Sequence, residues 1–569
     1  MPTLSLPIKP AFADAEQSSG NKNVWIFLLF WAVLNLLQIG FTELTSDEGY
    51  YWFYAQHLQW GYYDHPPMLA LLIKAGVALF PGEFGVRFFN VVLSTAGLYL
   101  FFTLLPNELK RSRKTYLVLL AAPLLHYLTF LVFPDGPLLF FSLLFLVVYK
   151  RFLAKQNVAN ALLLGLSLAL MAYSKYHGAL VLLFTVIAYP KLLRSGYFYL
   201  SLLVAAALFA PHLWWQYQNG FPTLKYHLSG RTGTWSFKHV GEYLSQQLIA
   251  IGPGLIFIPF VIKTNDVFER TLKVIIIGTF AFFLVSSFKT FVHFHWTSIA
   301  LYPLLYFAVS YYHQPKQKKL FNVLILPFAV LFFIARILLA VPLIADMHVG
   351  EDYYHGRKAW ADEIKKLADG RPVFMPDNLR EASLYSFYSG RQGVTLYGRP
   401  EKKSQYDLWG YEDSLQGRDV LFLTKYPHAG STKRSLLDKD FYYSVVPQFQ
   451  SFYNGLAIVA SVRSVSKDSI NATVTLTNVS GRSISFRPAE AGRYIGLFYS
   501  VEQDRTVRKA DAVYPLSVAD DLAPGAWVAK NVTVPVADLP EGDYRIYFGI
   551  RSGMLPDVVL SEPIPFVSK

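Results

Sequence analysis

Two adjacent carboxylic acids, Asp47 and Glu48, closely follow an apolar stretch at residues 24–41 that is long enough to cross a bilayer as a helix, at about 1.5 Å per residue. An ionised carboxylate at a membrane surface is costly unless it has a partner or a chemical task. Residues 50–54 are all aromatic and are typical of the headgroup layer, where partial desolvation raises the pKa of a carboxylate. The acids are therefore candidates for a general base, and the alternative is an ordinary helix cap beginning near Thr45.

A second group of residues that could do chemistry is Asp64-His65, which stands immediately before Pro66 and Pro67. The two prolines disfavour helix in the residues before them, so Asp64 and His65 are expected in an extended segment. There His65 could contact an anionic group, and Asp64 could orient His65 or bind a divalent metal ion together with it. The alternative is an ordinary turn at the start of a helix over 67–79. A divalent metal ion is the only cofactor that these residues suggest.

Further ionisable residues lie in connections on the same predicted face of the membrane as Asp47. Asp135 stands in a Pro-Asp-Gly-Pro turn, where aspartate is common for conformational reasons, so its interest comes from sharing that face. His293 and His295 have no spacing specific to zinc, and contact with a phosphate or a sugar is favoured. The remaining candidates are Lys175, Arg231 and Lys289, together with Tyr62 and Tyr63, whose rings could stack on a sugar, although an aromatic belt explains tyrosines here equally well.

The composition indicates a membrane protein with a soluble part. Of the 569 residues, 53% are hydrophobic and only 16% are charged, against roughly 25% in soluble domains, and the mean hydropathy is +0.30. The net charge of +13 comes with no base-stacking motif or basic stripe, so nucleic-acid binding is not expected. The absence of cysteine excludes disulfides, thiolate metal sites and a cysteine nucleophile.

About eleven apolar stretches predict membrane-spanning helices. They are 24–41, 86–105, 116–133, 137–152, 157–173, 178–190, 197–213, 243–262, 271–287, 296–312 and 320–344. Lysine and arginine gather in every second connection between them, which places the N-terminus in the cytoplasm and the region after the last span outside.

The expected organisation has four parts. Residues 1–23 form a disordered cytoplasmic N-terminus, and 24–344 form a polytopic α-helical membrane domain with eleven to thirteen spans, whose first outer loop is 42–85. Residues 345–448 mix charges, Gly and Pro with short apolar runs, and predict an extracytoplasmic α/β domain. Residues 449–569 show short alternating runs between turn signals, which are typical of an immunoglobulin-like β-sandwich.

Several motifs give the chain a family resemblance. It resembles the bacterial members of the dolichyl-phosphate-mannose-protein mannosyltransferase family, polytopic glycosyltransferases of the GT-C superfamily to which the lipid A aminoarabinose transferases also belong. The resemblance covers roughly residues 24–430. Its motifs are Asp47-Glu48-Gly-Tyr-Tyr-Trp, Gly61-Tyr-Tyr-Asp64-His65-Pro66-Pro67, Phe133-Pro134-Asp135-Gly136-Pro137, His293-Phe-His295-Trp296 and Gln405-Tyr406-Asp407-Leu408-Trp409.

The resemblance implies an inverting hexosyl- or pentosyltransferase of a bacterial inner membrane. The donor would be a polyprenyl-phosphate sugar, and the acceptor a hydroxyl of lipid A, another envelope glycan or a protein. Asp47 takes the role of general base or of a carboxylate that orients the acceptor, with Glu48 beside it, and Asp135 helps to position the acceptor or a metal. In the lipid A transferases the loop before the two prolines carries Glu-Lys, whereas here it carries Asp64 and His65. The donor phosphate and sugar would be bound by residues from the set His65, Lys175, Arg231, Lys289, His293, His295, Tyr62 and Tyr63.

Two other classes of function remain as alternatives. A transporter or flippase of a lipid-linked sugar would show paired repeats and ionisable residues near the bilayer midplane, and the sequence has neither. A non-catalytic envelope assembly protein would tolerate the loss of Asp47 but would need residues 449–569.

Overall fold

The computed structural model describes residues 22–228, 235–341, 354–399, 402–436, 439–488, 494–504, 506–553 and 555–568. The chain divides into two compact units. The helical unit comprises Met1–Thr42, Pro66–Trp214 and Gly233–Val349. The mixed unit comprises Glu43–His65, Trp215–Thr232 and Gly350–Lys569. Each unit is described by itself.

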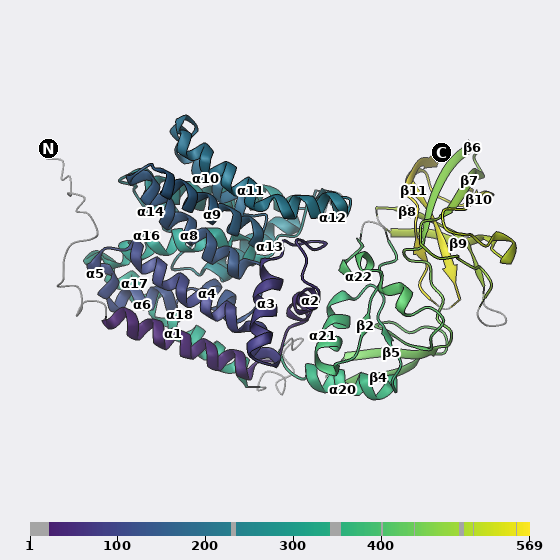
Figure 1. Ribbon diagram of the computed structural model, residues 1–569, viewed down its shortest axis with the longest axis horizontal. Helices are drawn as coiled ribbons and strands as arrows, with labels where there is room; N and C mark the ends of the chain where they lie inside the picture. Colours follow the sequence, from purple (N-terminus) through teal and green to yellow (C-terminus); the bar gives the residue numbers. More distant parts are fainter. Residues whose placement is uncertain are drawn as a thin grey trace. The chain divides into compact units, whose positions relative to one another are not determined.

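Helices make up almost all of the helical unit (Figure 1). They are α1 (Lys22–Phe41), α3 (Met68–Leu79), α4 (Gly82–Leu104), α5 (Asn107–Arg111), α6 (Arg113–Leu120), α7 (Pro123–Phe130), α8 (Asp135–Ala154), α9 (Val158–Ser174), α10 (Gly178–Ala188), η2 (Pro190–Arg194), α11 (Gly196–Gln218), α13 (Phe237–Ile251), α14 (Ile258–Val261), α15 (Val267–Ser287), η3 (Phe294–Ala300), α16 (Leu301–His313), η4 (Pro315–Gln317), α17 (Lys318–Leu324) and α18 (Leu326–Ala340). The last residues of α11 belong to the mixed unit.

Within the described residues, each predicted apolar stretch is helical, either as one helix or in two pieces, and residues 342–344 of the last stretch lie outside the described residues. The stretch 116–133 breaks between α6 and α7 because Pro123, the first residue of α7, has no N–H to continue the helix. The stretch 243–262 breaks after α13, where Gly252 adopts a φ of +85° that favours glycine. Among the described residues, five helical segments are long and apolar enough to cross a membrane, namely α1, α4, α8, α11 and Pro315–Ala340. The number of eleven spans stays a prediction.

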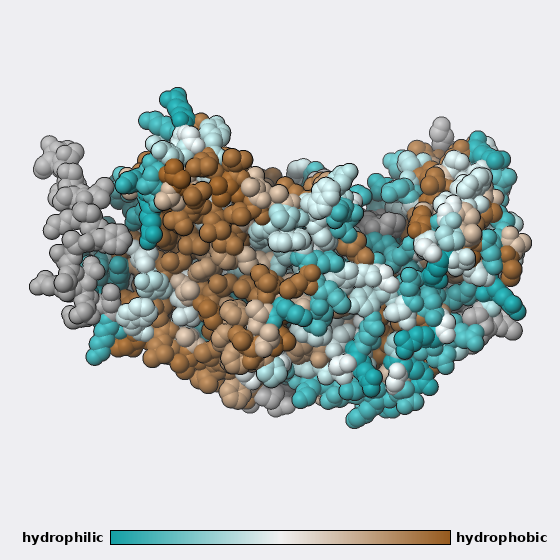
Figure 2. Space-filling view, viewed as in Figure 1, coloured by the Kyte–Doolittle hydropathy of each residue, from teal (hydrophilic) through white to brown (hydrophobic). Residues whose placement is uncertain are grey.

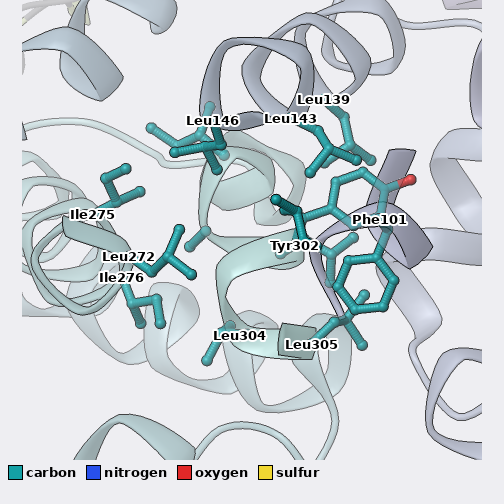
Figure 3. Packing of buried hydrophobic residues seen from close by; sticks show 14 of the residues in the cluster. Phe101, Leu139, Leu143, Leu146, Leu272, Ile275, Ile276, Tyr302, Leu304 and Leu305 are labelled. Carbon is teal, nitrogen blue, oxygen red and sulfur yellow. The ribbon is translucent and has the colours of Figure 1, made fainter. Parts of the chain in front are cut away.

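The core of the helical unit is apolar and closely packed. Phe101 of α4 stacks on Tyr302 of α16 with ring centroids 5.5 Å apart, and Leu143 and Leu305 lie in the same cluster (Figure 3). Large apolar side chains also cover the outside of these helices (Figure 2), and Val285, for example, is 69% exposed. A helix that is apolar on both sides is buried in protein on one side and in lipid on the other. The helical unit is therefore the membrane part of a multi-pass membrane protein.

A buried arginine joins two apolar helices of this unit. Arg336 of α18 donates hydrogen bonds to Asn35 Oδ1 at 2.8 Å and to Gln38 Oε1 at 3.4 Å, both on α1. Its guanidinium carbon lies 5.1 Å from the ring centroid of Phe130. A charge within a membrane helix is tolerated where neighbouring helices bind it, so these contacts explain how α18 accommodates Arg336.

The mixed unit begins with a five-stranded sheet of order β2-β1-β3-β5-β4. The strands are β1 (Val373–Phe374), β2 (Gly393–Val394), β3 (Val420–Thr424), β4 (Thr432–Leu436) and β5 (Lys439–Val446). β1 pairs in parallel with β2 and β3, whereas β5 is antiparallel to β3 and β4. The helices of this unit are α2 (Ser46–Gln56), α12 (Pro222–Leu228), α20 (Arg357–Ala368), α21 (Leu379–Ser389), α22 (Gln405–Leu408) and the short turns η6 (Tyr411–Ser414) and η7 (Val518–Asp520).

Two further sheets pack face to face in the rest of the mixed unit. One has the order β10-β7-β6, and the other the order β12-β11-β8-β9 with β13 also paired to β11. The strands are β6 (Leu456–Val465), β7 (Ser469–Asn478), β8 (Ile495–Gln503), β9 (Thr506–Pro515), β10 (Trp527–Pro535), β11 (Gly542–Ser552), β12 (Val558–Val559) and β13 (Ile564–Ser568). Side chains from both sheets, such as Val474 and Leu497, form one core. The predicted fold class is confirmed, while the domain limits at 345 and 449 stay predictions.

Glu412 joins the α/β region to the sandwich within the mixed unit. This side chain is buried and accepts hydrogen bonds from Ser451 Oγ at 2.8 Å, from the Tyr453 backbone N–H at 2.6 Å and from the Asn454 backbone N–H at 2.7 Å. Burial raises its pKa, although these donors and the more distant Lys403 lower it. The carboxyl therefore satisfies two backbone groups that the chain could not otherwise bury.

The substitution Glu412→Ala leaves the N–H groups of Tyr453 and Asn454 without their acceptor. We expect the free energy of unfolding of the mixed unit to fall by about 2–4 kcal/mol, as two buried donors lose their partner. Pulse proteolysis of the full chain in detergent over a urea series measures this. Glu541→Ala, which removes an exposed carboxylate, is the matched control and should change stability by less than about 0.5 kcal/mol. Equal stability of the two variants would contradict the role of Glu412.

Candidate active site

The segment that carries Asp47 and Glu48 is the first turn of α2, in the mixed unit. Thr45 is the N-cap residue of this helix and forms a capping box with Glu48. Glu48 Oε2 accepts hydrogen bonds from the Thr45 backbone N–H at 2.9 Å and from Thr45 Oγ1 at 3.1 Å. Glu48 is fully buried. The helix cap that the sequence offers as an alternative therefore exists, and Glu48 forms it, whereas Asp47 does not.

The next residue, Gly49, lets α2 lie very close to α21. A Cβ at position 49 would lie 3.0 Å from both the backbone N and the Cα of Leu384, which is closer than such atoms normally approach. Before α2, the Leu44 backbone N–H donates a hydrogen bond to Tyr388 Oη at 2.7 Å. Ser46 Oγ donates to Glu381 Oε1 at 3.3 Å. The position of α2 is thus set by α21.

Asp47 is left free of the cap and is held by a cation from α21. Arg380 Nε lies 2.7 Å from Asp47 Oδ1, and 35% of the Asp47 side chain is exposed. Although part of its surface is open, the protein atoms around the carboxyl raise its pKa above the ordinary 3.8. Arg380 lowers the pKa, while the negative charges of Glu48 and Asp64 raise it, and the net direction is upward. A partly accessible carboxylate with a raised pKa is suited to accept a proton.

Asp64 and His65 lie in the same unit as Asp47. Tyr54 Oη donates a short hydrogen bond to Asp64 Oδ1, and His65 Nε2 lies 3.9 Å from Asp64 Oδ2. The His65 ring also meets the Tyr51 ring edge-on, with centroids 5.7 Å apart. In the described ranges no three or more His, Asp or Glu side chains converge as metal ligands. The pair does not by itself provide the three protein ligands of a catalytic zinc site, so no step is derived through a metal.

The predicted sugar-stacking tyrosines occupy different environments. Tyr62 is fully buried, and its ring stacks on Tyr54 with centroids 4.3 Å apart and an interplanar angle of 7°. Tyr63 is half-buried, and its backbone N–H donates to Gln405 Oε1 at 2.7 Å. Its ring meets Tyr226 edge-on at 5.9 Å. Tyr63 therefore keeps an accessible surface, whereas Tyr62 packs inside the protein.

A second constellation surrounds Asp135, in the helical unit. Asp135 is the first residue of α8 and is fully buried. Its Oδ2 lies 2.7 Å from Lys175 Nζ and 3.7 Å from His295 Nε2, and its Oδ1 accepts a hydrogen bond from Ser298 Oγ at 3.1 Å. The positive end of the α8 dipole also favours a carboxylate at this position. Asp135 is thus held by ionic and polar partners within the bundle.

Close packing against Asn90 explains why the Pro-Asp-Gly-Pro turn has glycine at position 136. A Cβ at position 136 would lie 2.2 Å from Asn90 Oδ1, so only glycine fits. The Asn90 amide donates hydrogen bonds to the carbonyls of Leu128, Thr129 and Leu131 at 2.8 to 2.9 Å. Asn90 of α4 therefore holds the end of α7 and the start of α8 together, and with them Asp135.

The remaining candidates lie at several places in the helical unit. The rings of His293 and His295 stack with centroids 5.5 Å apart, and Trp296 lies 5.4 Å from His293. The Lys175 ammonium is 5.7 Å from the centroid of Trp296. Lys289 is exposed, and its ammonium lies 5.5 Å from the ring centroid of Trp235. Arg231 lies outside the described residues.

The sequence analysis missed three functional partners. Arg380, which binds Asp47, lies far from it along the chain. The only sequence feature near Arg380 is the helix start at Asn378, which does not indicate an ion pair with Asp47. Ser298, which binds Asp135, follows the His-Phe-His-Trp motif and could have been included with it. Tyr54, which binds Asp64, belongs to the aromatic run that was assigned to the membrane surface.

Comparison with known proteins supports the resemblance. Residues 64–215 match the family model described as dolichyl-phosphate-mannose-protein mannosyltransferase. The chain is 27% identical over 249 residues to the lipid A galacturonosyltransferase RgtD of Rhizobium johnstonii, a match that covers 40% of this chain. The match spans half the length of that curated relative.

Solved structures show the same fold. The crystal structure of ArnT from Cupriavidus metallidurans in the apo state has a TM-score of 0.55 and 14% identity, covering 75% of this chain and 98% of that one. The same protein bound to undecaprenyl phosphate has a TM-score of 0.53 and 15% identity, with 74% and 98% covered. The resemblance predicted from the motifs is therefore confirmed, and the fold is of the GT-C type.

The Asp135–Lys175 ion pair is testable by a double-mutant cycle. We expect Lys175→Met to destabilise the protein by about 3–5 kcal/mol, because it leaves a buried carboxylate without its cation. Adding Asp135→Asn should recover much of that loss, because the uncompensated charge is then absent. Thermal unfolding of the four proteins in detergent gives the coupling energy.

The matched control is the exposed pair Lys238–Glu242, at 3.9 Å, where Lys238→Met should change stability by less than about 1 kcal/mol. A loss of stability in Lys175→Met that is as small as that in Lys238→Met would refute the charge compensation of Asp135.

Proposed function

We propose that this chain, a relative of the dolichyl-phosphate-mannose-protein mannosyltransferases with the GT-C fold, is an integral-membrane glycosyltransferase. It transfers a sugar from a polyprenyl-phosphate donor to an acceptor hydroxyl at the outer face of a bacterial inner membrane. The donor class is supported by the ArnT structure bound to undecaprenyl phosphate. The name of the relative RgtD supports lipid A, or an envelope glycan like it, as acceptor. The N-terminus would lie in the cytoplasm and the mixed unit outside.

The observation that carries the proposal is the state of Asp47. Of the two adjacent acids, Glu48 forms the helix cap. Asp47 is partly exposed, its pKa is raised, and one of its oxygens binds Arg380. The second oxygen can therefore face an acceptor. We assign the general base to Asp47 and the structural cap to Glu48.

The reaction follows from these groups. The acceptor O–H gives its proton to the Asp47 carboxylate as the acceptor oxygen attacks the anomeric carbon. The bond between that carbon and the phosphate oxygen breaks, and the electron pair leaves with the polyprenyl phosphate. Attack from the side opposite the leaving group inverts the anomeric centre. Arg380 keeps Asp47 ionised before the reaction and fixes the orientation of its carboxylate. A general base must be ionised and correctly oriented in this way.

The leaving phosphate needs positive charge or hydrogen-bond donors, which stabilise the negative charge that develops on it. The charge of Lys175 is already compensated by Asp135. We therefore propose that Lys175 and Asp135 together position the Pro-Asp-Gly-Pro turn and Ser298. His293 and His295, which stack beside Trp296, and the exposed Lys289 are the proposed contacts of the phosphate and sugar. In the mixed unit, His65 is the proposed contact of the phosphate when it is protonated. Asp64 and His65 are the residues that would hold a divalent ion if the reaction uses one.

Replacing the base tests the proposal. With a panel of polyprenyl-phosphate sugars and lipid A in liposomes, we expect Asp47→Asn to lower the rate of transfer by about a hundredfold or more, since the proton acceptor is lost. Glu48→Gln keeps the cap geometry and serves as the neighbouring control, with a change of less than about tenfold. Loss of activity in Glu48→Gln but not in Asp47→Asn would reverse the assignment. Transport of the lipid-linked sugar without any transfer would favour the flippase alternative.

The pH dependence tests the role of Arg380. Transfer needs ionised Asp47, so the rate should fall as the pH drops through a pKa above the ordinary 3.8. Arg380 lowers that pKa, and Arg380→Met should therefore move the acid limb of the rate profile to higher pH. Arg380→Lys keeps the positive charge and should move the limb less. An acid limb at the same pH in all three proteins would show that Asp47 does not control it.

A further inference from the structure

The motif Gln405-Tyr406-Asp407-Leu408-Trp409 supplies no group to the proposed reaction, yet much of it is inaccessible to solvent. It consists of the short helix α22 and the residue that follows it. Gln405 and Tyr406 are fully buried, and Trp409 is half-buried. The partners of these three side chains lie in the mixed unit, on the segments that carry the candidate groups of the reaction.

Two residues of the motif hold the segment that contains α2 and the loop after it. Gln405 Oε1 accepts a hydrogen bond from the Tyr63 backbone N–H at 2.7 Å, and Tyr63 directly precedes Asp64. The ring of Trp409 packs against Phe53 of α2, with ring centroids 5.0 Å apart. The motif therefore contacts both the helix that carries the proposed base and the loop that carries Asp64.

The ring of Tyr406 fixes the second turn of α2. It stacks on Phe53 with ring centroids 3.9 Å apart and an interplanar angle of 9°. Phe53 lies four residues after Gly49, and residues at this spacing share a helix face. Gly49 brings the first turn of α2 against Leu384 of α21. With contacts at two successive turns, α2 is less free to rotate against α21 than the Gly49 contact alone would leave it.

The hydroxyl of Tyr406 reaches α21. Ser383 Oγ donates a hydrogen bond to the Leu379 carbonyl at 2.8 Å, which uses the hydroxyl proton of the serine. Tyr406 Oη, which lies 2.9 Å from Ser383 Oγ, therefore donates to it. Leu379 is the residue before Arg380. A chain of two hydrogen bonds thus leads from α22 to the start of α21, beside the arginine that binds Asp47.

The motif also fixes the position of α22 itself. Asp407 Oδ2 accepts hydrogen bonds from the Ser404 backbone N–H at 2.8 Å and from Ser404 Oγ at 3.0 Å, which forms a capping box. Asp407 Oδ1 lies 3.5 Å from Lys403 Nζ. Both orphan groups of the helix start are satisfied in this way, so Tyr406 stands on an ordered helix although α22 has only four residues.

The pair of Asp47 and Arg380 needs such a support. The side chains of Arg380 and Asp47 are 57% and 35% exposed, and exposed ion pairs are weak unless their geometry is well defined. The other charged groups that act on Asp47 are Glu48 and Asp64, and both are negative. A rotation of α2 against α21 would move Asp47 away from its cation and leave it among these acids.

We infer that Tyr406 is a positioning residue for the proposed general base. Its ring holds α2 and its hydroxyl holds α21, so that Arg380 stays on Asp47. Tyr406 takes no part in making or breaking a bond. This inference rests on the proposed function, because it concerns the base of that reaction.

The pH profile of transfer tests the inference. Tyr406→Leu should move the acid limb to higher pH by at least about half of the shift that Arg380→Met gives, because Arg380 then lowers the pKa of Asp47 less. Tyr406→Phe keeps the stack, loses the hydrogen bond to Ser383, and should move the limb less. Tyr406→Leu combined with Arg380→Met should give the limb of Arg380→Met alone, because Tyr406 acts through Arg380.

Tyr544 of β11 is the matched control. It is buried, its ring stacks on Phe566 with centroids 5.5 Å apart, and its Oη donates to the Pro540 carbonyl at 3.0 Å. Tyr544→Leu should destabilise the protein as Tyr406→Leu does and leave the acid limb in place. An acid limb that both variants move equally, or that Tyr406→Leu leaves in place while Arg380→Met moves it, overturns the inference.

A second readout does not depend on transfer. Difference infrared spectroscopy between each protein and the same protein with Asp47→Asn gives the pKa of Asp47 in the absence of donor. Tyr406→Leu should raise this pKa, and Tyr544→Leu should not. A raised pKa together with a wild-type protein that transfers no sugar would count against the proposed function and support the positioning by Tyr406. An unchanged pKa in Tyr406→Leu overturns the inference even where transfer is observed.

Discussion

The contact between α2 and α21 is the constraint on which the candidate site depends. Three consecutive residues have different roles: Asp47 pairs with Arg380, Glu48 closes the helix cap, and Gly49 allows the two helices to approach so closely that a Cβ there would be crowded against Leu384. A carboxylate in a cap accepts backbone N–H groups and is poorly placed to accept a proton from a substrate. Because Glu48 takes that position, Asp47 stays out of the cap, and 35% of its side chain is exposed.

The two acids that the motifs single out differ because their surroundings differ. Asp135 is fully buried and bound by Lys175 and Ser298, so its charge is compensated within the bundle. Among the described residues, Asp47 pairs with one cation, Arg380, and burial raises its pKa. We propose different roles for the two carboxylates, a proton acceptor for Asp47 and a structural anion for Asp135, because their environments differ in this way. The proposed assignment of the base thus rests on packing and charge and not on the motif alone.

The sequence predicted most of the helices and the positions of both acids, and the features that it did not predict have physical causes. The apolar stretches became helices, and the acids lie at the starts of α2 and α8, because hydrophobic length and helix-start signals are local. The break at Pro123 was also local, but counting run length overlooked it. Arg380 could not be found, since ion pairs between distant segments depend on tertiary packing. Tyr62 was assigned to a sugar, yet it stacks on Tyr54, because an aromatic run does not reveal which rings face inward.

The central claim is that Asp47 acts in the chemical step and not in binding. The most direct test measures, on one preparation of Asp47→Asn, the dissociation constant of the polyprenyl-phosphate sugar and the single-turnover rate of transfer. The account predicts a dissociation constant within about twofold of the wild-type value and a transfer rate lower by about a hundredfold or more. A dissociation constant that rises in proportion to the loss of transfer, with an unchanged rate at saturating donor, would contradict it.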